Sequence, residues 1–263
     1  MRFKMLIAYD GSHLSGWQVQ PNAPSVQGEI EKALALLLRH PVSIVGSGRT
    51  DAGVHAMGQT AHFDADEMPK LHALNSLLTK DIRIIKIEEA KDSFHAQYSA
   101  TGKIYHYHLW LDPVADPFSY KYSYKVPFPI STDLLAEAAT LFVGTHDFKS
   151  FSNLGSSVKT TVRQLRRLDI VQERGGLRLE FEGGGFLYKM VRNIVGTLLE
   201  VASHQRKVAD IAELFAAKDR RAVGVCAPAH GLFLMQVKYE TSRCDESAPA
   251  DGASQSHFVT TQK

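Results

Sequence analysis

Apolar and polar residues follow two spacings in the first hundred residues, and the spacings predict strands and helices in turn. Short apolar runs and alternation of apolar and polar positions favour strands, whereas apolar residues three and four positions apart favour helices. The predicted strands are residues 2–9, 42–46, 58–64 and 82–87, and the predicted helices are residues 25–39, with Ser25 as N-cap, and 70–79. The order is therefore strand, helix, two strands, helix, strand.

The rest of the chain repeats a mixture of strands and helices in a similar order. The predicted strands are residues 103–111, 163–171, 176–182 and 231–239, and the predicted helices begin after Ser131 or Thr132 and cover residues 186–202 and 207–217. This pattern predicts an α+β fold of two ferredoxin-like (RRM-like) lobes that share a mixed, mainly antiparallel sheet with a central cleft. We expect lobes at residues 1–102 and 103–239, followed by a disordered polar tail at residues 240–263.

Composition indicates a soluble, intracellular class of protein. The chain has 263 residues, of which 44% are apolar and 22% are charged, ordinary values for a folded protein. Cys226 and Cys244 match no metal-binding or disulfide spacing, which favours a reducing compartment. The apolar run at the N-terminus stops at Asp10, too early for a signal peptide, and no run reaches the roughly 18 apolar residues of a membrane span. We therefore expect a cytoplasmic location.

The charge is unevenly distributed along the chain. The net charge is +2, but residues 240–263 hold four acids and two bases, so the preceding residues carry +4. Basic residues cluster in this body of the chain, and the stretch SYKYSYK at residues 119–125 alternates tyrosine with lysine. The clusters are Arg163, Arg166 and Arg167; His204, Arg206 and Lys207; and Lys218, Arg220 and Arg221. Bases beside aromatic rings suit nucleic acid, although a solvated surface explains the same pattern.

The segment GSGRTDAGVHA at residues 46–56 places Asp51 in a turn bounded by glycines, directly after a predicted strand. Arg49 is two residues earlier, so both side chains can point into one space in an extended backbone. A neighbouring cation favours the ionised carboxylate that covalent or general-base catalysis needs. An Asx turn with a surface salt bridge is the alternative interpretation.

Other chemical interpretations fit the sequence poorly. The glycine-rich loop is not followed by the Gly-Lys-Ser/Thr of a phosphate-binding loop, and the glycines at residues 183–185 lack the third glycine of a dinucleotide fingerprint. His55 and His62 have no partners at metal-ligand spacing, so we expect no metal. Arg192 lies about 130° from the centre of the apolar stripe of its predicted helix. It is therefore either solvated or able to reach across the cleft from the second lobe.

Several motifs together resemble the TruA family of tRNA pseudouridine synthases. The segment GSGRTDAGVHAMGQTAHF, from residue 46, is similar to the motif that carries the family's catalytic aspartate. Six further segments match in family order over about nine tenths of the chain. They are residues 9–21, 25–34, 94–109, 144–151, 185–201 and 227–239.

The resemblance implies an isomerase that converts uridine to pseudouridine at positions 38, 39 and 40 of the tRNA anticodon stem-loop, without a cofactor or metal. It implies that Asp51 is the catalytic aspartate, that Arg192 pairs with it, and that Tyr105 packs on the target base. Arg49 matches a residue that helps to hold open the site of the flipped nucleotide. A homodimer with one tRNA across both subunits is also implied.

Two features depart from the family pattern. Gln97 stands where the family usually has arginine, and residues after Tyr239 have no family counterpart. The first departure puts part of the RNA-binding surface in doubt. A catalytically silent RNA-binding protein of the same fold and a nucleotide-dependent enzyme are the two other hypotheses; the intact Asp51, Tyr105 and Arg192 argue against the silent form.

Overall fold

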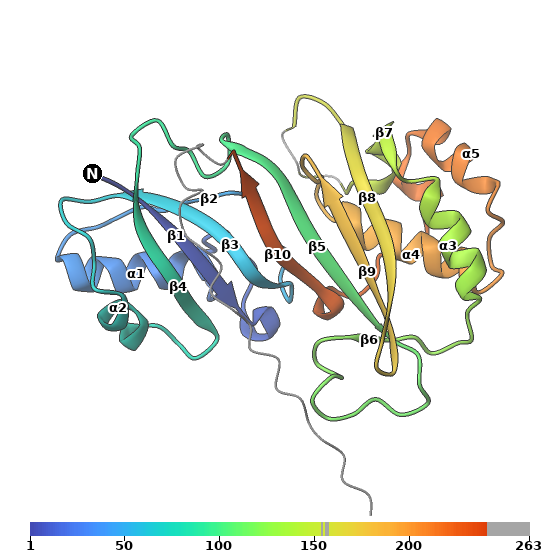
Figure 1. Cartoon of the computed structure of the whole chain (residues 1–263), viewed down its shortest axis with the longest axis horizontal. Helices are drawn as coiled ribbons and strands as arrows, with labels where there is room; N and C mark the ends of the chain where they lie inside the picture. Colours follow the sequence, from blue (N-terminus) through green and yellow to red (C-terminus); the bar gives the residue numbers. More distant parts are fainter. Residues whose placement is uncertain (154, 156–157, 241–263) are drawn as a thin grey trace, which may run out of the picture.

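Ten strands form one sheet that runs through the whole molecule (Figure 1). The structure, a computed structural model, describes residues 1–153, 155 and 158–240. The strands are β1 (Arg2–Tyr9), β2 (Val45–Gly46), β3 (His55–Asp64), β4 (Ile82–Ala90), β5 (Ala100–Trp110), β6 (Tyr124–Lys125), β7 (Gly144–Asp147), β8 (Val162–Glu173), β9 (Gly176–Gly183) and β10 (Leu232–Tyr239). The α-helices are α1 (Val26–Leu38), α2 (Leu71–Leu77), α3 (Thr132–Thr140), α4 (Met190–Ala202) and α5 (Asp210–Ala217).

The strand order is β4-β1-β3-β10-β5-β9-β8-β7, so the last strand in sequence lies in the middle of the sheet. β10 pairs in parallel with β3 and antiparallel with β5, and the short β6 pairs in parallel with β5. The other pairings are antiparallel. The predicted α+β class and the mainly antiparallel sheet are therefore confirmed. Because β10 joins strands from both halves, the seam between them is made by backbone hydrogen bonds.

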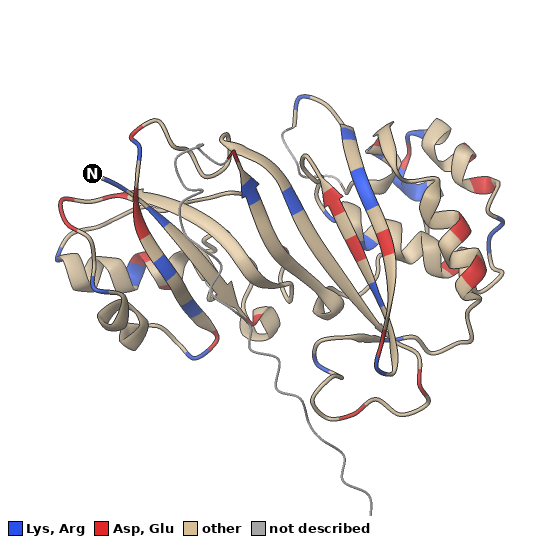
Figure 2. Ribbon diagram, in the orientation of Figure 1, with Lys and Arg blue, Asp and Glu red and all other residues tan. Residues whose placement is uncertain are grey.

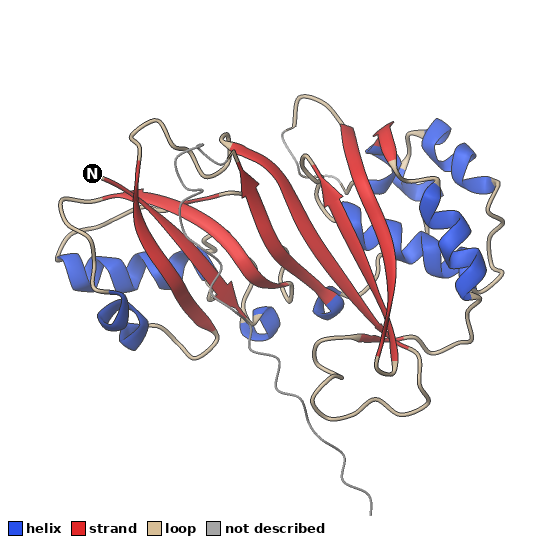
Figure 3. Cartoon of the chain, in the orientation of Figure 1, coloured by secondary structure: helices blue, strands red, loops and turns tan. Residues whose placement is uncertain are grey.

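One face of the sheet is mostly apolar. Strand registers align Phe3 of β1 with Phe63 of β3, and Leu234 of β10 with Tyr105 of β5, which in turn aligns with Phe181 of β9. The α-helices gather in two groups, α1 and α2 near β1 and β4, and α3 to α5 near β8 and β9 (Figure 3). Their apolar residues and those of the strands form one buried cluster. Burial of this surface is the main term that stabilises the fold.

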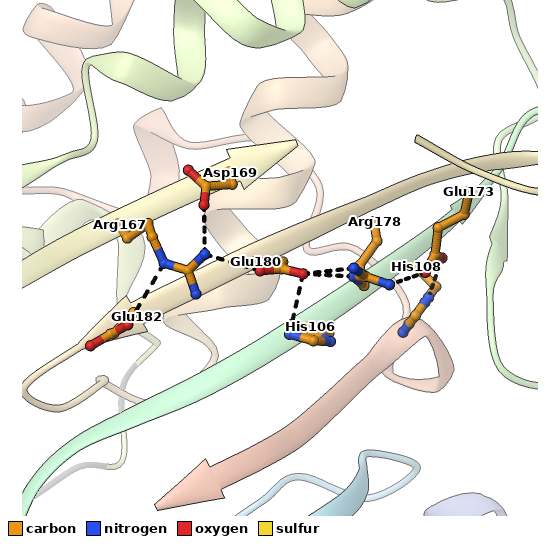
Figure 4. A network of polar contacts seen from close by, with 8 residues as sticks. All are labelled: His106, His108, Arg167, Asp169, Glu173, Arg178, Glu180 and Glu182. Carbon is orange, nitrogen blue, oxygen red and sulfur yellow. Dashed lines mark hydrogen bonds and ion pairs between the residues drawn. The ribbon is translucent and has the colours of Figure 1, made fainter. Parts of the chain in front are cut away.

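The opposite face of β5, β9 and β8 carries a ladder of paired charges (Figure 4). Successive side chains of a strand point to opposite faces, so His106 and His108 lie on the side away from Tyr105. Arg178 Nη2 lies 2.8 Å from Glu180 Oε1, and His108 Nδ1 lies 2.8 Å from Glu173 Oε2. Basic and acidic residues are interspersed on these strands (Figure 2). The basic side chains of this face therefore form ion pairs with carboxylates of the same chain.

The helix caps and most element types match the sequence prediction. Ser25 accepts a hydrogen bond from the backbone N–H of Gly28, and Ser131 accepts one from Leu134, so each serine begins its helix as expected. In the predicted strand at residues 42–46, only Val45 and Gly46 pair with a neighbour. The predicted helix at residues 186–202 begins only at Met190.

The late start of α4 has a local cause. Lys189 precedes it in the left-handed conformation, with φ of 60°, which interrupts helical geometry before Met190. The predicted disordered tail lies outside the described residues, apart from Glu240. In the part of the chain that the structure describes, no helix has the length and apolar character needed to span a membrane.

Candidate active site

The loop between β2 and β3 carries Asp51 and is held to the sheet along its length. Ser47 donates its backbone N–H to the Thr60 carbonyl at 2.8 Å and its hydroxyl to Gln59 Oε1 at 2.8 Å. Gln59 Nε2 in turn donates to the Gly48 carbonyl at 3.0 Å. A buried amide that satisfies two groups of a loop fixes the loop's path over the strand. We call residues 47–54 the aspartate loop.

The second part of the aspartate loop packs against β1 and the segment that follows it. The Tyr9 hydroxyl lies 2.8 Å from Thr50 Oγ1, and Trp17 donates its backbone N–H to the Thr50 carbonyl at 3.1 Å. Burial raises the pKa of Tyr9 to about 12, so its hydroxyl stays protonated. Gly53 has φ of 78°, a conformation that other residues seldom adopt, and closes the turn after Asp51.

Asp51 meets Arg192 from the other half of the sheet. Arg192 Nη1 donates to Asp51 Oδ2 at 2.6 Å, and the two side chains are 13% and 17% exposed. Charge-assisted bonds of this length are strong, and low exposure strengthens them further because water screens them less. The Arg192 side chain is therefore not solvated. Of the two interpretations of its position on the helix, the structure shows the one in which Arg192 reaches toward Asp51.

A second contact orients the Arg192 guanidinium. Arg192 lies in the first turn of α4, and its Nε donates to the Ala227 carbonyl at 2.7 Å. Ala227 returns its backbone N–H to the Arg192 carbonyl at 3.1 Å. The Tyr107 hydroxyl holds the same segment by donating to the Pro228 carbonyl at 2.8 Å. The segment before β10 thus covers one flank of α4 and fixes the arginine's direction.

Tyr105 lies on the apolar face of β5 and is 8% exposed. Its ring meets Phe186 edge to face, with centroids 5.1 Å apart and planes at 79°. Burial raises the pKa of the Tyr105 phenol far above its usual value, and the neighbouring Tyr9 phenol and the Asp51 carboxylate add to this rise. The negative charge of Asp51 thus reaches the Tyr105 phenol and disfavours its ionisation. Tyr105 therefore presents a neutral aromatic ring near the aspartate.

Arg49 behaves differently from the other predicted site residues. It is exposed, and no hydrogen bond or ion pair joins it to another residue within the described part of the chain. We expected Arg49 and Asp51 to point into one space, but no hydrogen bond or ion pair joins the two side chains. Asp51 pairs instead with Arg192 of α4. Within the residues that the structure describes, Arg49 is thus an unpaired cation at the surface of the aspartate loop.

The two histidines of the motif contact backbone groups. Gly11 donates its N–H to His55 Nδ1 at 3.0 Å, and Ala96 donates to His62 Nδ1 at 3.1 Å. Among the residues that the structure describes, no group of three or more His, Cys, Asp and Glu side chains could hold a metal ion. A cavity of about 540 Å³ opens beside His55, lined also by Tyr122, Phe233 and His108. Neither Asp51 nor Arg192 lines it, so we place the candidate site by the polar contacts instead.

The arrangement joins an oriented carboxylate, a guanidinium and a neutral aromatic ring. The carboxylate is suited to attack an electrophilic carbon or to accept a proton, and the ring is suited to stack on a flat base. The sequence analysis singled out neither Tyr9 nor Gln59, although Gln59 lies within the segment GSGRTDAGVHAMGQTAHF. It also gave no role to Lys103, two residues before Tyr105, whose Nζ donates to the Ser47 carbonyl at 2.9 Å.

The comparisons with known proteins agree on one family. The family model described as tRNA pseudouridine synthase matches residues 5–99 and 138–240. This match includes Asp51 and Arg192, whereas Tyr105 lies between its two segments.

Curated relatives match across that gap and over nearly their whole length. tRNA pseudouridine synthase A 1 of Protochlamydia amoebophila (strain UWE25) is 56% identical over 246 residues, covering 90% of this chain and 96% of that protein. The tRNA pseudouridine synthase A of Exiguobacterium sp. (strain ATCC BAA-1283 / AT1b) is 44% identical over 243 residues, covering 91% of this chain and 98% of that protein. That of Bacillus pumilus (strain SAFR-032) is 43% identical over 246 residues, covering 91% and 100%. With the motifs, the fold and these relatives in agreement, the chain belongs to the tRNA pseudouridine synthase family of isomerases.

Proposed function

We propose that this chain converts uridine to pseudouridine at positions 38, 39 and 40 of the tRNA anticodon stem-loop, with Asp51 as the catalytic carboxylate. The observation that carries the proposal is the hydrogen bond of 2.6 Å from Arg192 to Asp51 across the seam of the sheet. An aspartate held by a guanidinium, with a neutral aromatic ring near it, is the group that the isomerisation needs.

The reaction is an internal transfer of the base. The N1–C1′ bond breaks, the uracil turns, and a C5–C1′ bond forms; C5 loses its proton and N1 gains one, so no redox partner or donor is required. The target base must leave its stack, at a cost of a few kcal/mol, and be held outside it. In the proposal Tyr105 stacks on the flipped base, Arg192 aims the Asp51 carboxylate, and Arg49 contacts the RNA backbone.

We also propose a fold and assembly that go with this function. Residues 1–102 and 103–239 are two ferredoxin-like lobes, and the cleft between them, at β10 and β5, receives the RNA. The active form is a homodimer in the cytoplasm with one tRNA across both subunits. A molar mass in solution equal to the single chain's 29.1 kDa, with full activity, would contradict the dimer.

The substitution Asp51→Asn tests the catalytic assignment. It keeps the side chain's shape and its ability to accept a bond from Arg192, but removes the charge. We expect release of tritium from uracil C5 of tRNA to fall to background while tRNA affinity changes little. Asp64→Asn is the matched control, because Asp64 pairs with Arg2 at the C-terminal end of β3 and the protein should tolerate its substitution. Activity near wild type in Asp51→Asn would refute the catalytic role.

A further inference from the structure

The amino group of Lys103 contacts the start of the aspartate loop. Lys103 is on β5 and points to the same face as Tyr105, because the two residues are two positions apart in one strand. Its Nζ donates to the Ser47 carbonyl at 2.9 Å. Ser47 is four residues before Asp51, so this contact and the Arg192 contact hold the two ends of a short segment.

Lys103 is a poor choice for stability alone. No carboxylate pairs with it among the described residues, whereas Lys238 of β10, on the opposite face of the sheet, pairs with Glu182. Burial lowers the pKa of the Lys103 amine to about 8, and no charged neighbour contributes to this change. A desolvated ammonium without an anion costs free energy. A reason for lysine at this position must therefore come from what the amine holds.

The amine is packed directly against the loop backbone at Gly48. A Cβ added to Gly48 would lie 2.3 Å from Lys103 Nζ and 3.7 Å from Lys103 Cε. The first distance is a clash and the second is ordinary contact. The φ angle of Gly48 lies outside the left-handed region, so the backbone itself would accept an alanine. The lysine amine and the glycine thus occupy adjoining space, and a larger residue at position 48 would displace the amine.

From these contacts we propose that Lys103 is a positioning residue for the isomerisation. It holds the Ser47 carbonyl so that the aspartate loop keeps the Asp51 carboxylate at Arg192 and near Tyr105. Gln59 and Tyr9 restrain the same loop from the first half of the chain, whereas Lys103 and Arg192 restrain it from the second half. The inference rests on the proposed function, because it concerns the geometry of that reaction's carboxylate.

The substitution Lys103→Met tests the proposal through a separation of rate and affinity. Methionine keeps most of the stem and removes the donor. With saturating tRNA in a single-turnover assay of tritium release, we expect the rate to fall at least tenfold and the Kd for tRNA to stay within threefold of wild type. A rate within twofold of wild type overturns the proposal. A raised Kd with a smaller salt dependence also overturns it, because Lys103 would then be a phosphate contact.

The substitution Gly48→Ala tests the same contact without changing the lysine. The new methyl group should push Nζ off the Ser47 carbonyl and lower the single-turnover rate. In the background of Lys103→Met the methyl group meets only the side-chain end near the former Cε, at contact distance, so Gly48→Ala should then have little further effect. Strongly non-additive rates support the proposal, and additive rates overturn it.

Two controls make each outcome decisive. Lys238→Met removes a lysine from the neighbouring strand β10, where it pairs with Glu182, and should leave the rate unchanged. If Lys103→Met does not fold, Gly48→Ala alone decides, because its lysine is intact. A wild-type protein without activity on tRNA refutes the proposed function, whereas an active wild type with an equally active Lys103→Met refutes only the role of Lys103.

Discussion

Arg192 and Asp51 are 141 residues apart in sequence, yet their side chains meet at 2.6 Å in a largely buried contact. Asp51 belongs to the loop after β2, and Arg192 to the first turn of α4 in the other half of the chain. β10 pairs with both β3 and β5, and so joins the half that carries Asp51 to the half that carries Arg192. The candidate site is therefore a product of the seam and cannot be assembled by either half alone.

The substitution Arg192→Ala should slow turnover strongly while leaving RNA binding largely intact. It removes the partner of a largely buried carboxylate and the group that aims it at the substrate. We expect kcat/KM to fall by about 100-fold or more, a loss of about 3 kcal/mol in transition-state stabilisation. Tritium release and filter binding of tRNA measure the two quantities.

The conservative change Arg192→Lys separates charge from orientation. Lysine keeps the positive charge but loses the Nε donor that bonds to the Ala227 carbonyl. We expect it to recover only part of the lost rate. If Arg192→Ala instead weakens tRNA binding and leaves turnover at saturation unchanged, Arg192 is a phosphate contact and the positioning role is wrong.

Local pattern predicted the elements well where one face of an element meets the core. In α1, Ser25 and the buried Val26, Ile30 and Leu34 lie where helical spacing placed them, because capping and amphipathicity act within the helix. The strand at residues 42–46 was too long, since Val42 and Ile44 are buried without pairing to a neighbour. Burial and strand pairing are different constraints, and apolar spacing reports only the first.

The site was less accessible to sequence reasoning, because its contacts are tertiary. A helical wheel placed Arg192 away from the apolar stripe and could not reveal that the segment around Ala227 covers that flank. The clusters of bases were likewise ambiguous: Arg206 bonds to Glu200, and Arg220 bonds to Asn193 and to backbone carbonyls. These arginines hold the second half together, so charge clusters alone overstated the surface available to RNA.

When RNA binds, the ring of Tyr105 should contribute more to the function than its hydroxyl group does. Stacking of an aromatic ring on a base is worth about 1–3 kcal/mol. We therefore expect Tyr105→Ala to slow the single-turnover rate at least tenfold, and Tyr105→Phe to keep tRNA affinity within threefold of wild type. Phe186→Leu is the companion variant, because it removes only the edge-to-face neighbour. An unchanged rate in Tyr105→Ala would exclude the stacking role.

The exposed guanidinium of Arg49 should act on binding and its dependence on salt. Arg49 has no partner within the described residues, so Arg49→Ala costs the fold little. If it contacts one phosphate, the slope of log Kd against log salt should fall by about 0.7–0.9. Arg221→Ala serves as the reference, because Arg221 is also exposed but is paired with Asp219. Equal slopes in wild type and Arg49→Ala would contradict a phosphate contact.

The buried amine of Lys103 should give the wild-type protein a stability that rises with pH. Its folded pKa of about 8 lies below the ordinary value of 10.5, so between these values the unfolded chain binds more protons and alkali favours the folded state. From pH 7.5 to 9.5 we expect the free energy of unfolding to increase by about 1–2 kcal/mol through this residue. This pH range ends before the buried tyrosines affect the free energy of unfolding. Their raised pKa values destabilise the folded state only above about pH 10. Urea titrations of wild type and Lys103→Met across this range measure the increment, which Lys103→Met should lack. Parallel pH profiles of the two proteins would show that the amine is charged with no penalty in the folded state.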